Sequence, residues 1–92
     1  MIQSVIKKDG GKVPFNQEKL KASITAAADD AGLQENEKNA IAEKVLYSVE
    51  AAFEGREEVS TAEIRDKVLS ELHASFPIVA EAWIKYDSAR GK

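Results

Sequence analysis

Residues 2–16 read IQSVIKKDGGKVPFN, and this stretch predicts a β-hairpin that leads straight into a helix. Its first half, residues 2–7, is a short run rich in β-branched side chains, which is typical of a strand. The run stops at Asp9-Gly10-Gly11, where glycine can take the positive φ of a tight turn. Residues 12–15 then return as a second strand, and Pro14, which has no N–H to donate, places that strand at the edge of a sheet.

Two helices are expected after the hairpin. Asn16 is a good N-cap for the first, which the spacing of the apolar residues extends until Gly32. The second is expected to run from Glu35 or Asn36 to Glu54, with an apolar stripe on one face and glutamates and lysines on the others.

Two further helices and a short strand complete the prediction. Ser60 and Glu63 form a capping-box pattern at the start of a third helix, and Pro77 is suited to the first turn of a fourth. Residues 56–59 can add a brief strand that pairs with the hairpin. The sequence therefore predicts an α+β fold in a single domain, residues 1–92.

The composition limits the classes of function. Among 92 residues there is no cysteine, which excludes disulfides, thiolate zinc sites and thiol nucleophiles. His73 is the only histidine, and near a helix end it is better explained as a partner of the helix dipole than as a metal ligand. Since no general acid–base pair stands out, an enzyme is not expected. No signal peptide or membrane-spanning stretch is apparent, so we expect a soluble, cytoplasmic protein.

Positive charge gathers at one end of an acidic sequence. The net charge is −3, yet residues 1–21 carry five lysines against two carboxylates, a local charge of +3. A basic end of this kind suits a compact polyanion, whereas the acidic remainder disfavours direct binding of nucleic acid. A chance scatter of lysines remains an alternative. Neither a Walker A loop nor a dinucleotide-binding glycine fingerprint is present.

Three of these lysines are candidate phosphate contacts. Lys7 and Lys8 end the first strand, and because neighbouring strand residues face opposite ways, one can reach a ligand under the hairpin while the other lies at its rim. Lys19 lies in the first turn of a helix, where a cation opposes the macrodipole by about 0.3–1 kcal/mol. A bound phosphate would explain this placement, and so would the neighbouring Glu18 or extension into solvent.

Thr61 and Arg65 lie about one turn apart at the start of the third expected helix and so share a face. Together they can contact a base or a sugar. The alternatives are a capping hydroxyl and an exposed helical arginine. Trp83 and Tyr86 are interpreted as packing aromatics rather than as stacking partners of a base, because of their helical spacing.

Taken together, these motifs resemble the ATP-cone domain, which is found at the start of ribonucleotide reductase catalytic subunits. The matching blocks follow in order over nearly the whole chain: Val5-Ile6-Lys7-Lys8-Asp9-Gly10, Pro14-Phe15-Asn16, Lys19-Leu20, Ser23-Ile24, Val59-Ser60 with Ile64, Asp66, Val68 and Leu72, and Val79-Ala80-Glu81-Ala82-Trp83-Ile84-Lys85-Tyr86. The fold that the resemblance implies is a β-hairpin or three-stranded sheet cap over a four-helix bundle.

The resemblance also implies an adenine-nucleotide site beneath the hairpin. The residues carried over to it are Lys7, Lys8, Asn16, Lys19 and Thr61, with Val5 and Leu20 as apolar walls and with Arg65 and Arg90 at less certain positions. There are two departures from the family pattern. Lys8 stands where arginine is usual, and Asp87 stands where a basic residue is common. An ammonium point charge fixes phosphate geometry less tightly than a guanidinium fork.

The function implied by the resemblance is allosteric regulation, with no catalytic residues in the domain itself. The expected ligand is ATP or dATP, with or without Mg²⁺, and the expected partner is a ribonucleotide reductase subunit or further copies of the chain in a homo-oligomer. In reductases dATP commonly inhibits by promoting an inactive assembly, and the same logic is expected here. Two alternatives are a free-standing accessory transcriptional regulator and a helical protein-interaction module whose nucleotide site has decayed.

Overall fold

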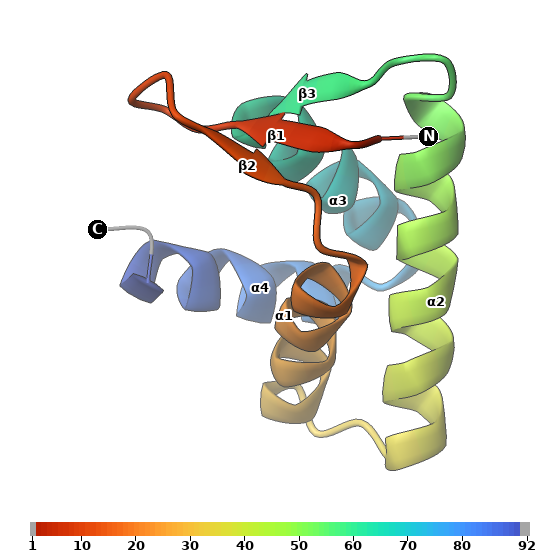
Figure 1. Cartoon of the computed structure of the whole chain (residues 1–92). Helices are drawn as coiled ribbons and strands as arrows, with labels where there is room; N and C mark the ends of the chain where they lie inside the picture. Colours follow the sequence, from red (N-terminus) through yellow and green to blue (C-terminus); the bar gives the residue numbers. More distant parts are fainter. Residues whose placement is uncertain (1, 91–92) are drawn as a thin grey trace.

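The hairpin and a third strand form a small sheet at one end of the molecule (Figure 1). A computed structural model describes the backbone of residues 2–90 and the side chains of residues 2–85. Strand β1 (Ser4–Ile6) pairs antiparallel with β2 (Lys12–Pro14) and parallel with β3 (Glu58–Ser60), in the order β2-β1-β3. Pro14 therefore lies on an edge strand, as the sequence predicts.

The turn between β1 and β2 depends on one glycine and one carboxylate. Gly10 has a φ of +91°, a conformation that side-chain-bearing residues rarely adopt. The Lys7 N–H donates to the Gly11 carbonyl at 2.7 Å, and the Asp9 carboxylate accepts from the Gly11 N–H at 2.9 Å. These contacts close the turn locally, so the hairpin needs no support from the helices at its tip.

Four helices lie on one side of the sheet (Figure 1). They are α1 (Gln17–Asp30), α2 (Glu35–Ala52), α3 (Thr61–Ser75) and α4 (Pro77–Arg90). Asn16 caps α1 through its side chain, and Ser60 and Glu63 form the expected capping box at α3. The starts of these helices lie where the sequence predicts them, because each start is fixed by a local side-chain hydrogen bond.

The helices pack in a ring in which α1 and α3 each contact both α2 and α4. The core is formed by their inner faces together with the inner face of the sheet. Its largest fully buried side chains are Ile24, Leu72, Val45, Val49, Val59, Val68 and Val79. Trp83 is 5% exposed, and its indole N–H donates to the Ser23 hydroxyl at 3.4 Å. The packing role predicted for Trp83 is confirmed. The side chain of Tyr86, for which the same role is predicted, lies outside the described residues.

Several boundaries differ from the sequence prediction. Strands β1 and β2 cover residues 4–6 and 12–14, shorter than the predicted 2–7 and 12–15. Helix α2 ends at Ala52 rather than Glu54, because the chain leaves helical geometry at Phe53 and turns at Gly55, whose φ is +88°. The third strand covers residues 58–60 rather than 56–59. Its register places Val59 opposite Val5, so that both side chains are buried in the core. Among the described residues, no helix is long and apolar enough to cross a membrane.

The capping box of α3 makes the stability of the fold depend on pH. A hydrogen bond from the Arg56 guanidinium and another from the Ser60 backbone lower the pKa of Glu63 from 4.5 to about 2. Because the pKa is lower in the folded chain, the stabilisation is present above pH 4.5 and is lost as the pH falls from 4.5 toward 2.

We expect the urea concentration at the midpoint of unfolding to fall over this pH range. In Glu63→Gln, which lacks the titrating carboxyl, the midpoint should fall less.

The matched control for this measurement is Glu37→Gln. Glu37 accepts the Gln34 N–H at 3.1 Å and so occupies the same capping position in α2, without a guanidinium partner among the described residues. Because Glu37 has no contact with Arg56, its substitution should change the fall of the urea midpoint between pH 4.5 and 2 less than Glu63→Gln does. Equal pH profiles for Glu63→Gln and the unmodified chain would contradict the assignment of the acid transition to Glu63.

Candidate functional site

An open cavity of about 900 Å³ lies between the sheet and the starts of two helices. This volume falls within the range of about 300–1,000 Å³ that is typical of small-molecule sites. The lining comes from β1, β2, the β2–α1 connection, and the first turns of α1 and α3: Ile2, Val5, Lys7, Val13, Pro14, Phe15, Asn16, Gln17, Glu18, Lys19, Leu20, Thr61 and Ile64.

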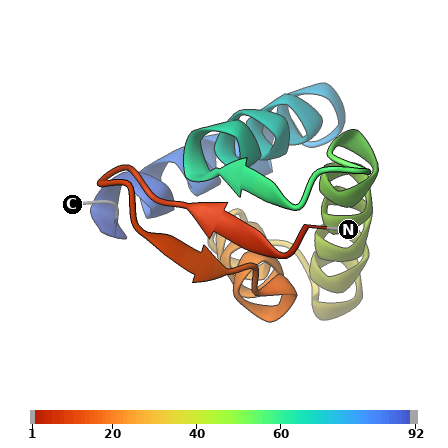
Figure 2. The ribbon, with the colours of Figure 1, turned by 45° about the horizontal axis from the view of Figure 1, so that its top comes forward.

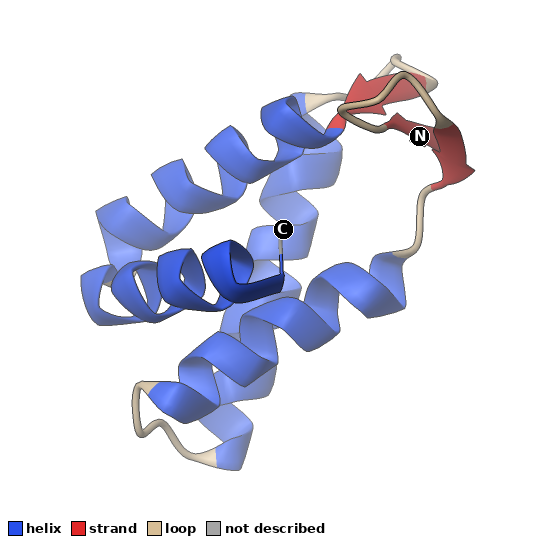
Figure 3. Ribbon diagram, turned by 90° about the vertical axis from the view of Figure 1, so that its left-hand side faces the viewer, coloured by secondary structure: helices blue, strands red, loops and turns tan. Residues whose placement is uncertain are grey.

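Two short connections bring the starts of α1 and α3 to this cavity. Only Phe15 and Asn16 separate β2 from α1, and the last residue of β3, Ser60, is itself the N-cap of α3. Figure 2 looks onto the sheet and shows α1 beginning at the end of β2 and α3 running beside β3. Figure 3 shows the loop into α1 and the direct passage from β3 into α3. Because the two strands share a sheet, two positive helix ends approach one cavity.

The start of α1 offers hydrogen-bond donors to the cavity. The Asn16 side-chain oxygen accepts the Lys19 N–H at 3.1 Å, and the Asn16 carbonyl accepts the Leu20 N–H at 3.2 Å. The N–H groups of Gln17 and Glu18 have no carbonyl partner within the helix, as is usual for a first turn. Groups of this kind bind carboxylate or phosphate oxygens.

The basic residues of the first segment fall into two groups. Lys12 forms an ion pair with Glu58, and Lys21 forms one with Glu43 at 3.0 Å. Each of these carboxylates raises the pKa of its lysine. Lys7 and Lys19 line the cavity, and neither forms an ion pair with a carboxylate of residues 2–85. Lys8, the fifth lysine of the segment, is exposed and lies outside the lining, so two of the three lysines without a described carboxylate partner border the cavity.

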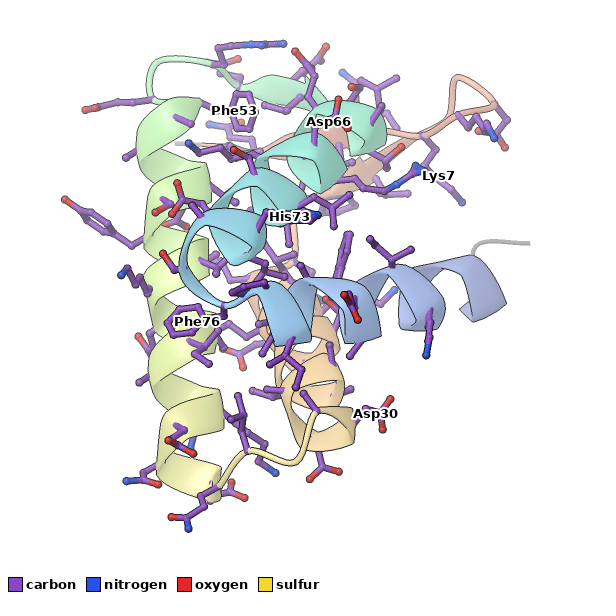
Figure 4. The ribbon with its side chains drawn as sticks, turned by 180° about the vertical axis from the view of Figure 1, so that it is seen from behind. Lys7, Asp30, Phe53, Asp66, His73 and Phe76 are labelled. Carbon is purple, nitrogen blue, oxygen red and sulfur yellow. The ribbon has the colours of Figure 1, made fainter. Side chains whose placement is uncertain are left out.

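Most of the residues predicted for the site lie together around this cavity. Those that line it are Val5, Lys7, Asn16, Lys19, Leu20 and Thr61. Figure 4 labels Lys7 at the end of β1, where the chain enters the hairpin turn. Lys8 and Arg65 are exposed and are not part of the lining. The side chain of Arg90 lies outside the described residues.

The alternation of the strand explains why Lys7 and Lys8 differ. Val5 faces the core, so the side chain two positions later, Lys7, lies on the same side of the hairpin. Lys8 belongs to the turn, is exposed and is not part of the lining. The structure therefore separates the two lysines that end the predicted strand.

Several lining residues are absent from the sequence-based prediction. Val13 pairs with Val5 across the hairpin, and Ile64 follows Thr61 by three residues on one helix face, so strand and helix periodicity could have indicated both. Gln17 could not have been recognised in this way. Its amide Nε2 donates to the Glu50 carboxylate on α2, a residue far away in the sequence.

The donor set suits an anion better than a metal ion. The cavity presents two ammonium groups, a hydroxyl and helix-start N–H groups, with Glu18 as its only carboxylate among the described residues. No group of three or more His, Cys, Asp or Glu side chains in the described part of the chain could hold a metal. The apolar part of the lining, such as Val5, Leu20 and Ile64, can cover a base.

Comparisons with known proteins give a family and one relative. A family model described as "ATP cone domain" matches residues 3–92. An anaerobic ribonucleoside-triphosphate reductase from Salmonella typhimurium strain LT2 is 33% identical over 87 residues, which make up 94% of this chain. The matched region is 12% of the length of that reductase, so the chain resembles only a small part of it.

Asn16 allows the fold and the anion site to be tested separately. Aspartate is as good an N-cap as asparagine, and its charge is favourable at a helix start, so Asn16→Asp should keep or raise the melting temperature. The same carboxylate lies in the wall of the cavity and should repel a triphosphate. We expect titration calorimetry to show at least tenfold weaker ATP binding, whereas unchanged binding would mean that phosphates do not approach Asn16.

Proposed function

This chain belongs to the ATP-cone family, and we propose that it is a regulatory module that binds ATP or dATP in the cavity beneath its sheet without transforming it. The ATP cone is a regulatory rather than a catalytic domain, and it is found in the allosteric control of ribonucleotide reductases. The binding of a nucleotide in this particular cavity is our proposal.

The observation that carries the proposal is the convergence of positive charge on a partly apolar cavity. Lys7 from β1, Lys19 from α1 and the first turns of α1 and α3 all border the same space. Each contribution alone has an ordinary structural explanation, but one ligand that is anionic at one end and flat and apolar at the other would satisfy all of them. A nucleoside triphosphate has this character.

The mechanism we propose is a shift of population between conformations or assemblies. A ligand can shift such an equilibrium only by its difference in affinity for the two states. ATP and dATP differ by one ribose hydroxyl, so the two states must differ in how they surround the sugar or the groups next to it. The chain would in this way report the balance of the two nucleotides.

We propose a ribonucleotide reductase subunit, or further copies of this chain, as the partner that responds to this shift. The similarity to the Salmonella reductase supports a link to that enzyme class. A cytoplasmic location, where both nucleotides are present, is part of the same proposal. Any Mg²⁺ would arrive with the triphosphate, since the described residues provide no carboxylate cluster for it.

The first test is a calorimetric titration of the unmodified chain with ATP, dATP and GTP, combined with a mass measurement of the assembly in each state. We expect ATP or dATP to bind at submillimolar concentration and more tightly than GTP. We also expect one of the two adenine nucleotides to change the mass of the assembly. Adenine nucleotides that bind no better than GTP would rule out the proposed specificity.

The second test removes the two cavity lysines. Hydrogen bonds to charged groups contribute about 1.5–3 kcal/mol each, so Lys7→Ala combined with Lys19→Ala should weaken ATP binding by at least about 100-fold. Both side chains belong to exposed residues, so the circular dichroism spectrum should not change.

The matched control is Lys12→Ala combined with Lys21→Ala. It removes the same charge from the same segment, but its two ammonium groups are paired with Glu58 and Glu43 and lie outside the lining. Loss of these exposed ion pairs should change the stability of the fold little. Equal losses of ATP affinity in the two double variants would show that net charge, and not the cavity, determines binding.

A further inference from the structure

Gln17 links the cavity to a helix that the cavity does not touch. As the first residue of α1, it lines the cavity, and its side-chain Nε2 donates a hydrogen bond to the Glu50 carboxylate on α2. Both residues are half-buried. The start of α1 lies beside α2 in Figures 1 and 2, and the two helices pack against each other.

Glu50 is an unfavourable residue for its position. It lies in the last turn of α2, where a negative charge opposes the helix dipole, and no basic residue lies in that turn. It also lies one side chain away from a cavity suited to an anion, where a carboxylate raises the local negative potential. Local helix stability therefore does not explain why a carboxylate occupies this position, and its contact with Gln17 offers a different explanation.

The chemistry of the contact fixes the orientation of the Gln17 amide. An ionised carboxylate only accepts hydrogen bonds, whereas the two ends of a glutamine amide differ, one donating and one accepting. Glu50 therefore holds the nitrogen end toward α2. The carbonyl Oε1 and the second N–H of Gln17 remain for a ligand, in a fixed arrangement.

We propose that Gln17 contacts the bound nucleotide and that Glu50 is the positioning residue that holds its amide for this contact. The inference rests on the proposed nucleotide site and adds α2 to the elements that determine its affinity. A ligand that engages Gln17 is thereby connected through one hydrogen bond to the position of α2 relative to α1.

A positioning role for Glu50 and simple electrostatics predict opposite changes of ATP affinity when the charge of Glu50 is removed. Removal of a negative charge near an anionic ligand should strengthen binding if only long-range charge matters. If Glu50 positions Gln17, Glu50→Gln should weaken ATP binding instead, because glutamine can accept or donate and no longer selects one amide orientation. One misplaced hydrogen bond corresponds to about a three- to tenfold loss of affinity.

The experiment is a calorimetric ATP titration of the unmodified chain, Glu50→Gln, Gln17→Leu and the double variant. Glu54→Gln is the control, because Glu54 is an exposed glutamate in the turn just after α2 and its substitution removes the same charge. We expect Glu50→Gln to bind ATP three- to tenfold more weakly and Glu54→Gln to bind it as tightly as the unmodified chain or slightly more tightly. In the Gln17→Leu background, Glu50→Gln should cause no further loss.

The outcomes separate this inference from the proposed function. If the unmodified chain binds no adenine nucleotide, the proposed function fails and the inference fails with it. If the unmodified chain binds ATP and Glu50→Gln binds it equally or more tightly, only the positioning role is overturned. A loss that is the same with and without Gln17 would also overturn it. Melting temperatures without nucleotide show whether each variant is folded. If Glu50→Gln is not, Glu50→Asp, which keeps the charge but shortens the reach, replaces it.

Discussion

Three residues of β3 pair in parallel with three residues of β1, with Ser4 opposite Glu58 and Ile6 opposite Ser60. Strands this far apart in the sequence lose considerable chain entropy when they meet, and the burial of Val5 and Val59 on the inner face of the sheet offsets that loss. Because β3 passes directly into α3, the same pairing places the start of α3 beside the start of α1. The cavity exists because these two helix starts share one sheet.

The distribution of charge around this sheet is uneven for a physical reason. Two lysines that do not line the cavity are paired with carboxylates, Lys12 with Glu58 and Lys38 with Asp29. Lys7 and Lys19 lack such a partner among the described residues and line the cavity, Lys7 just after β1 and Lys19 in the first turn of α1.

Helix α1 is the element through which an event in the cavity can reach the rest of the molecule. Its first turn borders the cavity, and its small buried residues Ala27 and Ala28 allow close packing with its neighbours. Ser23 connects it to Trp83 on α4, and Gln17 connects it to Glu50 on α2. A shift of α1 on ligand binding would therefore change its contacts with α2 and α4. The outer faces of these helices could pass the change on to the proposed reductase subunit or second copy of the chain.

The sequence alone determined which elements form and where α1, α3 and α4 begin, because Asn16, Ser60, Glu63 and Pro77 act through hydrogen bonds or sterics within a few residues. It also indicated Lys7, Asn16, Lys19 and Thr61, since strand alternation and helix starts place them by local rules and the family resemblance names them together. Only the tertiary structure decided that β3 pairs in parallel with β1 and that Val13 and Ile64 complete the cavity. It also brought Gln17 to Glu50. These contacts join distant parts of the chain, and distant contacts depend on how whole elements pack, which no short stretch of sequence encodes.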